Sequence, residues 1–402
     1  MICPACSTAL PDVADYCQSC GTDLYPDDQD IKRRFFSKPD EPVASFAIVS
    51  SIMPRGATRH PQTYRIAFTI AIGVALLASL FGALPIAVLV AAFAVPVVYL
   101  TYLYDVNLWK DAPVLVVGIA FALTGALSVG FSLVWKGWLP MRVSLSGVPS
   151  SPSPIAILLL VLLVPIVGEI IRQLGPVLLA SRPKFDDLMD GVTFGITSGL
   201  AYAAGDTLIR QWDLLTGGLA SAEPGQWAPL ILLEGLIKPL IIGTASGLAA
   251  AEFAGLGKGY DGFSPRYFVA VGIAVGANAV YALGIYLLGF VGTPMLAIFL
   301  QIIFGAIILG LLILRIRAVL QLGLMEGALT TAACSEFFGG VSKADMKVCS
   351  KCEMPLMPAA NFCNACGTQT EAAVVPTSVV AQEPEPGAAD TPLEVSSIGE
   401  GE

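Results

Sequence analysis

Charge and histidine are scarce in this sequence, and both shortages limit what the chain can be. Only 13% of its 402 residues are charged and 55% are hydrophobic, whereas about a quarter of the residues in a soluble domain carry charge. The mean hydropathy is +0.74. The single histidine, His60, precedes the first long apolar run, so no histidine is expected within a membrane as a metal ligand or base. This composition excludes an ordinary soluble protein and favours one that lies largely in a lipid bilayer.

Long apolar runs fill the middle of the chain. A helix needs about 20 residues to cross about 30 Å of hydrocarbon. Eight runs are that long, or nearly so: 65–84, 86–104, 112–135, 154–180, 189–209, 228–253, 266–289 and 293–315. The fifth run is the least apolar because it carries Asp190 and Asp206. The sequence therefore predicts an all-α polytopic membrane protein, with about eight transmembrane helices over 65–317 and a helical linker over 318–347.

Basic residues fall mainly on one side of this predicted topology. An even number of spans puts both ends on the same side, and loops rich in Lys and Arg are cytoplasmic. With cytoplasmic ends, the inner segments hold Lys32, Arg33, Arg34, Lys38, Arg55, Arg59, Arg65, Lys110, Arg182, Lys184, Lys258, Arg266, Arg315 and Arg317. The outer loops hold only Lys136, Arg142 and Arg210. We therefore expect a multi-pass protein of the cell membrane with both termini in the cytoplasm.

The segments outside the apolar region differ in composition. Residues 25–64 form a basic cytoplasmic linker, in which 43–53 is too short to span and reads as an interfacial segment or a strand. Residues 369–402 are rich in Pro, Glu, Ala and Ser, and we expect an acidic disordered tail there.

The same cysteine motif occurs near both ends, at 1–24 and at 348–368. The first copy is Cys3-x2-Cys6-x10-Cys17-x2-Cys20, and the second is Cys349-x2-Cys352-x10-Cys363-x2-Cys366. Each pair of cysteines two residues apart can present both thiolates to one ion, and two such pairs complete a closed four-cysteine zinc site. Disulfides are the alternative, but a cytoplasmic location argues against them. Both copies resemble the short zinc ribbons of many archaeal and bacterial membrane proteins.

These two ribbons are expected to be structural rather than catalytic. A unit of about 20 residues is too small to bury a sufficient core, so bound zinc would supply the folding energy. The ribbon loops contain Asp12, Asp15 and Asp23 and almost no basic residues, which makes nucleic acid an unlikely ligand. Cytoplasmic proteins are the expected partners of the ribbons.

Ionisable residues inside the predicted spans are candidates for function, because they are costly in a bilayer. Glu169, Arg172 and Gln173 lie at i, i+3 and i+4 of the fourth span and so share a helix face. Asp206 lies deep in the fifth span. Glu234 and Lys238 form an i, i+4 pair in the sixth, whereas Asn278 and Gln301 are predicted to make interhelical hydrogen bonds.

The order of these residues resembles the PrsW family of intramembrane proteases. The segment Phe185-Asp-Asp-Leu-Met-Asp-Gly191 is similar to the family's F-D-D-P-L-D-G, and a glycine-rich stretch follows it. Gly168-Glu169-Ile-Ile-Arg172 stands where the family has E-E-x-x-K. Tyr202-x-x-x-Asp206 stands where it has F-x-x-x-E, and Pro239–Gly247 where a histidine motif begins. The resemblance covers about 154–290 and implies a peptidase acting on membrane proteins, with Glu169, Arg172 and Asp206 as its site residues.

Gly168, Arg172 and Asp206 differ from the residues that the family motifs have there, and no histidine lies in a predicted span. These departures leave three interpretations open. Two carboxylates in one site can activate water when one is protonated and one is not, so Glu169 and Asp206 could retain peptidase chemistry if they meet in a hydrated cavity. Alternatively, Glu169, Arg172, Asp206 and Lys238 neutralise one another, and the protein is a non-catalytic membrane adaptor whose ribbons bind partners. A transporter would instead require broken helices at mid-membrane.

Overall fold

In the computed structural model, helices form nearly all of the regular structure. The described residues are 1–25, 63–81, 83–105, 114–136, 152–182, 185, 187–216 and 231–370. Among them there is no strand, only four isolated β-bridges within the ribbons. The predicted interfacial segment 43–53, His60, Asp186 and almost all of the basic linker and acidic tail lie outside the described residues. The all-α fold class is confirmed for the part of the chain that the structure covers.

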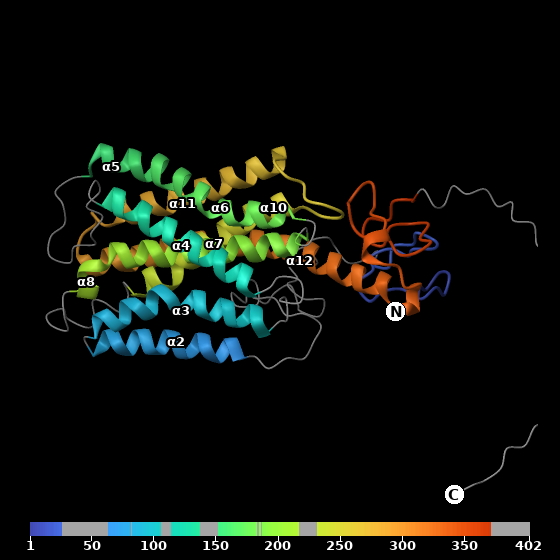
Figure 1. Ribbon diagram of the computed structural model, residues 1–402, viewed down its shortest axis with the longest axis horizontal. Coiled ribbons are helices and arrows are strands. Elements are labelled where there is room, and N and C mark those ends of the chain that lie inside the picture. The colour runs from blue at the N-terminus through green and yellow to red at the C-terminus, as the bar shows by residue number, and fades with distance from the viewer. Residues whose placement is uncertain are drawn as a thin grey trace, which may run out of the picture.

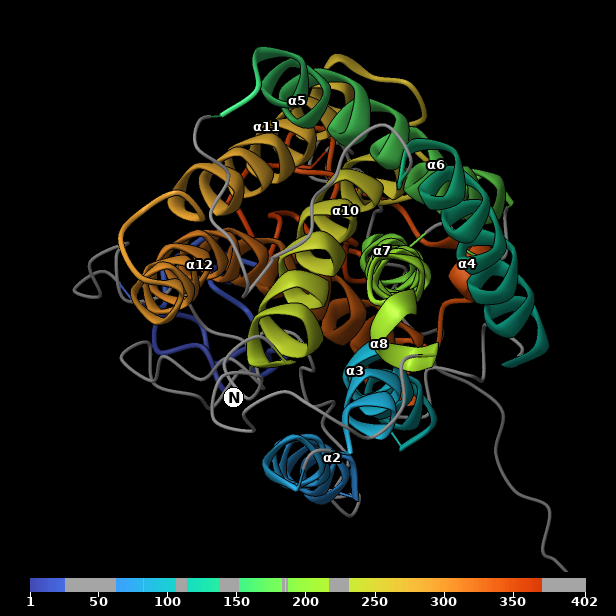
Figure 2. The same ribbon diagram turned by 90° about the vertical axis from the view of Figure 1, so that its left-hand side faces the viewer.

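Each of the eight apolar runs contains a helix (Figures 1 and 2). In chain order the helical segments are α2 (Thr63–Leu80), α3 (Leu84–Asp105), α4 (Val114–Lys136), α5 (Pro154–Leu158), η2 (Leu159–Leu163), α6 (Val164–Ala180), α7 (Leu188–Arg210), α8 (Trp212–Thr216), η3 (Leu233–Ile237), α10 (Lys238–Ala254), α11 (Pro265–Leu288) and α12 (Pro294–Cys334). Segments α5, η2 and α6 run on as one helix, as do η3 and α10.

Both of these continuous helices contain a π-helical turn, and each turn ends two residues before a proline. Pro165 follows η2, and Pro239 follows η3. Proline has no N–H to bond to the carbonyl four residues earlier, and its ring crowds that carbonyl. A wider π turn relieves the crowding without ending the helix, and such turns are frequent at functional sites. Both turns therefore widen the helix close to Glu169 and Lys238.

Among the residues that the structure describes, five segments are long and apolar enough to cross a membrane: Val116–Trp135, Pro154–Ala180, Leu233–Ala254, Pro265–Leu288 and Met295–Cys334. Pro85–Thr101 is a shorter apolar helix. Together they establish a multi-pass membrane protein, whereas the number of eight spans stays a prediction. Helix α7 is less apolar, but nearly all of its residues are buried, and Figure 2 shows it among α4, α6 and α10. The protein around it, rather than lipid, covers its polar groups.

Glycines allow α7 and α10 to pack backbone against backbone. On α7, Gly191, Gly195 and Gly199 are four residues apart and face α10. A Cβ added at Gly195 would lie 2.6 Å from the carbonyl oxygen of Ser246, and one at Gly199 would lie 2.6 Å from Cα of Gly243. Small residues at this spacing are typical of close helix pairs in membranes. This packing brings the polar residues of α7 and α10 together.

Helix α12 continues beyond the other helices and carries the C-terminal ribbon at its end (Figure 1). Two 3-10 turns, Glu336–Phe338 and Lys343–Asp345, connect it to that ribbon. The N-terminal ribbon lies at the same end and contacts the C-terminal one, since Asp15 N donates a hydrogen bond of 2.9 Å to the carbonyl oxygen of Asn364. Two domains in contact must lie on the same side of a bilayer. This contact agrees with the expectation that an even number of spans separates the ribbons, which stays a prediction.

Candidate functional site

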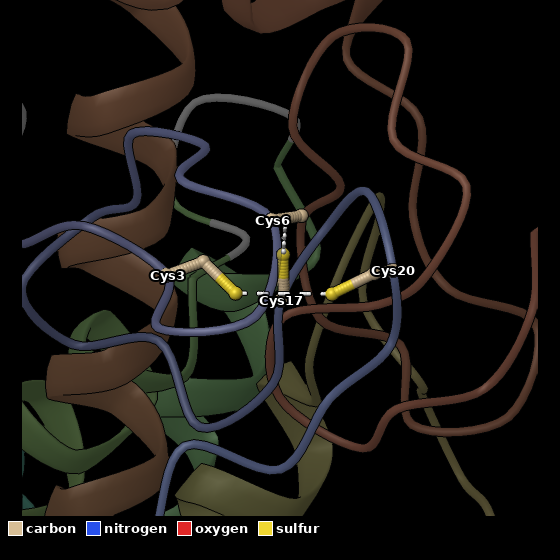
Figure 3. Close-up of side chains that lie close together, drawn as sticks. All are labelled: Cys3, Cys6, Cys17 and Cys20. Atoms are coloured by element: carbon tan, nitrogen blue, oxygen red, sulfur yellow. Dashed lines mark hydrogen bonds between the residues drawn. The ribbon is translucent and has the colours of Figure 1, made fainter.

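Each cysteine motif folds into a cluster that could hold a metal ion. In the N-terminal cluster, Cys3 Sγ is 3.7 Å from Cys20 Sγ, and Cys6 Sγ is 3.5 Å from Cys17 Sγ (Figure 3). In the C-terminal cluster, the corresponding distances are 3.7 Å for Cys349 to Cys366 and 3.6 Å for Cys352 to Cys363. Four sulfurs bound tetrahedrally at about 2.3 Å from zinc would be about 3.8 Å apart. Both clusters therefore fit a closed four-cysteine metal site.

Local backbone turns aim the thiols of each ribbon at one point. Ser7 and Glu353 follow the second cysteine of their motifs with φ of 59° and 60°, and Gly21 and Gly367 follow the fourth with φ of 72° and 67°. Hydrogen bonds with Thr22 lower the pKa of the Cys20 thiol to about 6. Cysteine binds a metal ion as the thiolate, so this threonine favours the binding form of Cys20.

Within the helix bundle, Glu169 is buried in a network that joins α6, α7 and α10, here called the Glu169 network. Arg172 donates to Glu169 Oε2 from Nε at 3.0 Å and from Nη2 at 2.6 Å. Gln173 donates to the other carboxylate oxygen at 2.7 Å, and Ser246 Oγ lies 3.2 Å from Oε2. Ser198 of α7 donates to the carbonyl oxygen of Arg172 at 2.6 Å. Both carboxylate oxygens of Glu169 are thus engaged by neighbouring side chains.

Asp206 belongs to a second network, here called the Asp206 network. Its Oδ2 is 2.7 Å from Arg210 Nε and 2.8 Å from Lys238 Nζ. Its Oδ1 accepts a hydrogen bond of 2.9 Å from Ser132 Oγ of α4. Lys238 is also 2.6 Å from Glu234, one helical turn earlier. Asp206 is therefore held by two cations and a hydroxyl, in a chain of charges that ends at Glu234.

A cavity of about 80 Å³ adjoins the Asp206 network, with room for about two or three water molecules. Its lining comes from α6, α7, η3, α10 and α11: Val164, Pro165, Arg172, Tyr202, Asp206, Arg210, Glu234, Lys238, Ile242, Asn278, Tyr281, Ala282 and Ile285. Glu169 is not part of this lining. The two carboxylates that the peptidase interpretation requires in one hydrated site thus lie in separate networks, and only Asp206 borders the cavity.

Gly168 explains how the altered motif fits together. A Cβ at this position would lie 2.9 Å from both Arg172 Nη1 and Tyr202 Oη. The guanidinium carbon of Arg172 is 4.7 Å from the centre of the Tyr202 ring, an arrangement that favours a cation–π contact. Arginine and tyrosine therefore occupy the space next to Gly168 that a larger residue would need. Three of the departures from the family motifs, at Gly168, Arg172 and Tyr202, therefore lie in mutual contact.

The remaining predicted polar residues have varied partners. Gln301 Nε2 donates to the carbonyl oxygen of Ile285 on the neighbouring helix, as expected, at 2.8 Å. For Asn278 the expectation of an interhelical bond was wrong: its amide nitrogen donates to the carbonyl oxygen of Ala274 in its own helix at 2.8 Å, and the residue also lines the cavity. Asp187 is the N-cap residue of α7, but its side chain makes no capping hydrogen bond. Its Oδ2 lies 3.2 Å from Lys343 Nζ.

Sequence reasoning missed several members of the two networks. Arg210 was assigned to an outer loop, although its position four residues after Asp206 could have indicated the ion pair. Ser132, Ser198 and Ser246 gave no such signal, since serines are common in membrane helices and only the packing of α4, α7 and α10 brings them to the charges.

Comparison with known proteins identifies one family. Residues 112–213, about a quarter of the chain, match the model of the PrsW family, described as PrsW family intramembrane metalloproteases. The match includes Glu169, Arg172 and Asp206, starts earlier than the motif resemblance and ends before Pro239. No curated protein and no solved structure matches the chain. The resemblance of this membrane protein to the PrsW family of intramembrane proteases is thus confirmed over residues 112–213.

Proposed function

We propose that the chain is a diverged, non-hydrolytic PrsW-like membrane protein whose polar core holds its helices together. The observation that carries this proposal is the pairing of every core carboxylate described above. Glu169 lies 2.6 Å from Arg172, Asp206 lies within 2.8 Å of both Arg210 and Lys238, and Glu234 lies 2.6 Å from Lys238. A general base must reach the proton it removes. Carboxylates already engaged by cations cannot do so without breaking these pairs.

The metal implied by the family's description does not suit this core. Among the described residues, only the two cysteine clusters bring three or more metal-ligating groups together. Asp206 already accepts from Ser132 and contacts two cations, and a metal ion there would be repelled by Arg210 and Lys238. Both oxygens of Glu169 are engaged as well. The residues of the bundle therefore do not fit the metal ion of a metalloprotease.

Retained peptidase activity is the competing proposal, and the cavity supports it. Asp206 and the buried hydroxyl of Tyr202, which has no hydrogen-bond partner, both line a space large enough for water. In this alternative, Asp206 would exchange a cation for a water molecule when a substrate binds. Its substrates would be membrane proteins.

A cleavage assay separates the two proposals. Full-length protein in detergent is incubated with a panel of single-span substrates, beside an active PrsW-family protease as a positive control. We expect no cleavage by the wild type. Cleavage that is lost in both Glu169→Gln and Asp206→Asn but kept in Asp213→Asn, a change at an exposed carboxylate of α8, would establish the peptidase instead.

For the whole protein we propose an adaptor role, with zinc in both ribbons and the ribbons in the cytoplasm of the cell. The positive-inside distribution of Lys and Arg supports this orientation. Partner proteins of the ribbons can be sought by cross-linking in cells. We expect cross-linked partners of the wild type to be lost when Cys349 and Cys352 are both changed to Ser. An unchanged set of partners would contradict a role for the C-terminal ribbon.

A further inference from the structure

The two ribbons meet through a reciprocal set of backbone hydrogen bonds. The amides of Asp15 and Tyr16 donate to the carbonyl oxygen of Asn364, both at 2.9 Å. The amides of Asn361 and Phe362 donate to the carbonyl oxygen of Gln18, at 2.9 and 3.0 Å. Asn361, Phe362 and Asn364 occupy the positions in the second motif that correspond to Asp15, Tyr16 and Gln18 in the first. Each ribbon thus offers its partner the same edge.

Side chains repeat this reciprocity. The Phe362 ring covers Gly21, where an added Cβ would lie 2.8 Å from the ring. The Tyr16 ring covers Gly367 in the same manner, with a corresponding distance of 2.7 Å. A glycine is required at both positions for its positive φ and for the aromatic ring above it. The pairing face of a ribbon therefore consists of one aromatic residue, one glycine and the backbone between them.

This face depends on the metal site beneath it. Tyr16 immediately precedes Cys17, and Gly21 immediately follows Cys20, with the same order around Cys363 and Cys366. A bound ion would fix the turn between the third and fourth cysteines, and that turn carries the pairing face. Loss of the ion from one ribbon should therefore disturb the surface that holds the other.

The ribbons are attached unequally to the rest of the protein. In the C-terminal ribbon, Cys349 and Met354 pack against Leu329 of α12, and Met357 packs with Ala333. The core of the N-terminal ribbon is separate, and within these clusters only Val13 reaches the end of α12. The C-terminal ribbon is thus anchored on the helix bundle, whereas the N-terminal ribbon is held largely by the pairing face.

We propose that the pairing face is a homotypic recognition surface, which binds a second zinc ribbon with an aromatic residue before the third cysteine and a glycine after the fourth. In this chain the partner is the chain's own other ribbon. The C-terminal ribbon is held in place by α12, and its pairing face stabilises metal binding in the N-terminal ribbon. The coupling is therefore directional, from the C-terminal site to the N-terminal site.

Zinc release from the full-length protein in detergent tests this proposal. Cys366→Ser leaves only the N-terminal four-cysteine site, and Cys20→Ser leaves only the C-terminal one. With a chromogenic chelator, we expect the N-terminal site in Cys366→Ser to release zinc at least tenfold faster than either ion leaves the wild type. We expect a change below threefold for the C-terminal site in Cys20→Ser. Wild-type release rates in both variants would overturn the proposal.

Variants that keep all eight ribbon cysteines guard against simple unfolding of a ribbon. Phe362→Ala removes the ring over Gly21 and should accelerate release from the N-terminal site at least tenfold. Phe337→Ala is the matched control, because Phe337 is 77% exposed and lies outside the pairing face. Equal release from both variants would refute the role of the aromatic contact.

Light scattering should show a monomer, and a dimer that dissociates in Phe362→Ala would show that the partner is a second copy.

Discussion

Three of the residues that differ from the family motifs, Gly168, Arg172 and Tyr202, contact one another in the structure. A Cβ added at Gly168 would lie 2.9 Å from both Arg172 Nη1 and Tyr202 Oη, so this position has no room for a larger residue. Arg172 in turn reaches Glu169 with two nitrogens and stacks on Tyr202. A return to the family residue at one position alone would therefore disturb the other two.

Gly168→Ala tests this coupling. We expect the free energy of unfolding to fall by about 1–3 kcal/mol, the usual cost of overpacking, because both neighbours are buried. In a Tyr202→Phe background, which removes the crowded hydroxyl, the same substitution should cost less. Gly130→Ala in α4 is the control, since a Cβ there meets nothing within 4 Å. Equal costs in both backgrounds, measured by thermal unfolding in detergent, would show that the residues are not coupled.

The cysteine sites were fully predictable from local sequence, whereas the core networks were only partly so. Each cysteine site is formed within one short motif, so spacing alone determines which sulfurs meet. In the Glu169 network, the helical spacing of Arg172 and Gln173 predicted their position beside Glu169. Ser246 comes from another helix, and its place depends on how α6 and α10 pack. Nothing local in the sequence encodes that packing.

At the scale of elements, the central feature is the close approach of α7 and α10. Gly191, Gly195 and Gly199 bring α10 so near that backbone atoms of the two helices touch. This contact places Asp206 beside Lys238 at 2.8 Å. The sequence indicated the glycine-rich helix, but not which helix it would face.

Gly195→Ala should be among the most damaging small substitutions in the chain. An added Cβ would lie 2.6 Å from the carbonyl oxygen of Ser246 and 2.7 Å from Cα of Gly247. Backbone cannot move aside as a side chain can, so we expect a loss of about 3 kcal/mol, at the upper end for overpacking. Gly118→Ala in α4, where nothing lies within 4 Å, should be close to neutral. Similar unfolding temperatures for both variants would contradict backbone contact between α7 and α10.

For the whole molecule, contact between the ribbons restricts the topology. In the described part of the chain, five helices have the length and composition of a span, but five crossings would place the ribbons on opposite sides of the membrane. We therefore expect either at least one further crossing in the helix bundle or one of the five helices not to cross. Eight crossings, as the sequence predicts, satisfy this condition.

Reporter fusions at the two ends test this topology. A reporter that is active only in the cytoplasm, fused to either terminus of the full-length chain, should be active in both fusions. The physical reason is the contact of Tyr16 with Asn364, which requires one shared compartment. Activity at one terminus only would contradict the ribbon pairing and an even number of spans.

The stability of Asp206→Asn tests the structural role of the core most directly. The substitution leaves Arg210 and Lys238 buried beside a neutral side chain. Removing one partner of a buried ion pair usually costs about 3–5 kcal/mol, whereas a residue kept for catalysis is often neutral or stabilising when replaced. We therefore predict a fall of about 3–5 kcal/mol in the free energy of unfolding in detergent, with no change in Asp345→Asn, at an exposed carboxylate between α12 and the C-terminal ribbon. An Asp206→Asn protein as stable as the wild type, or more stable, would contradict this account.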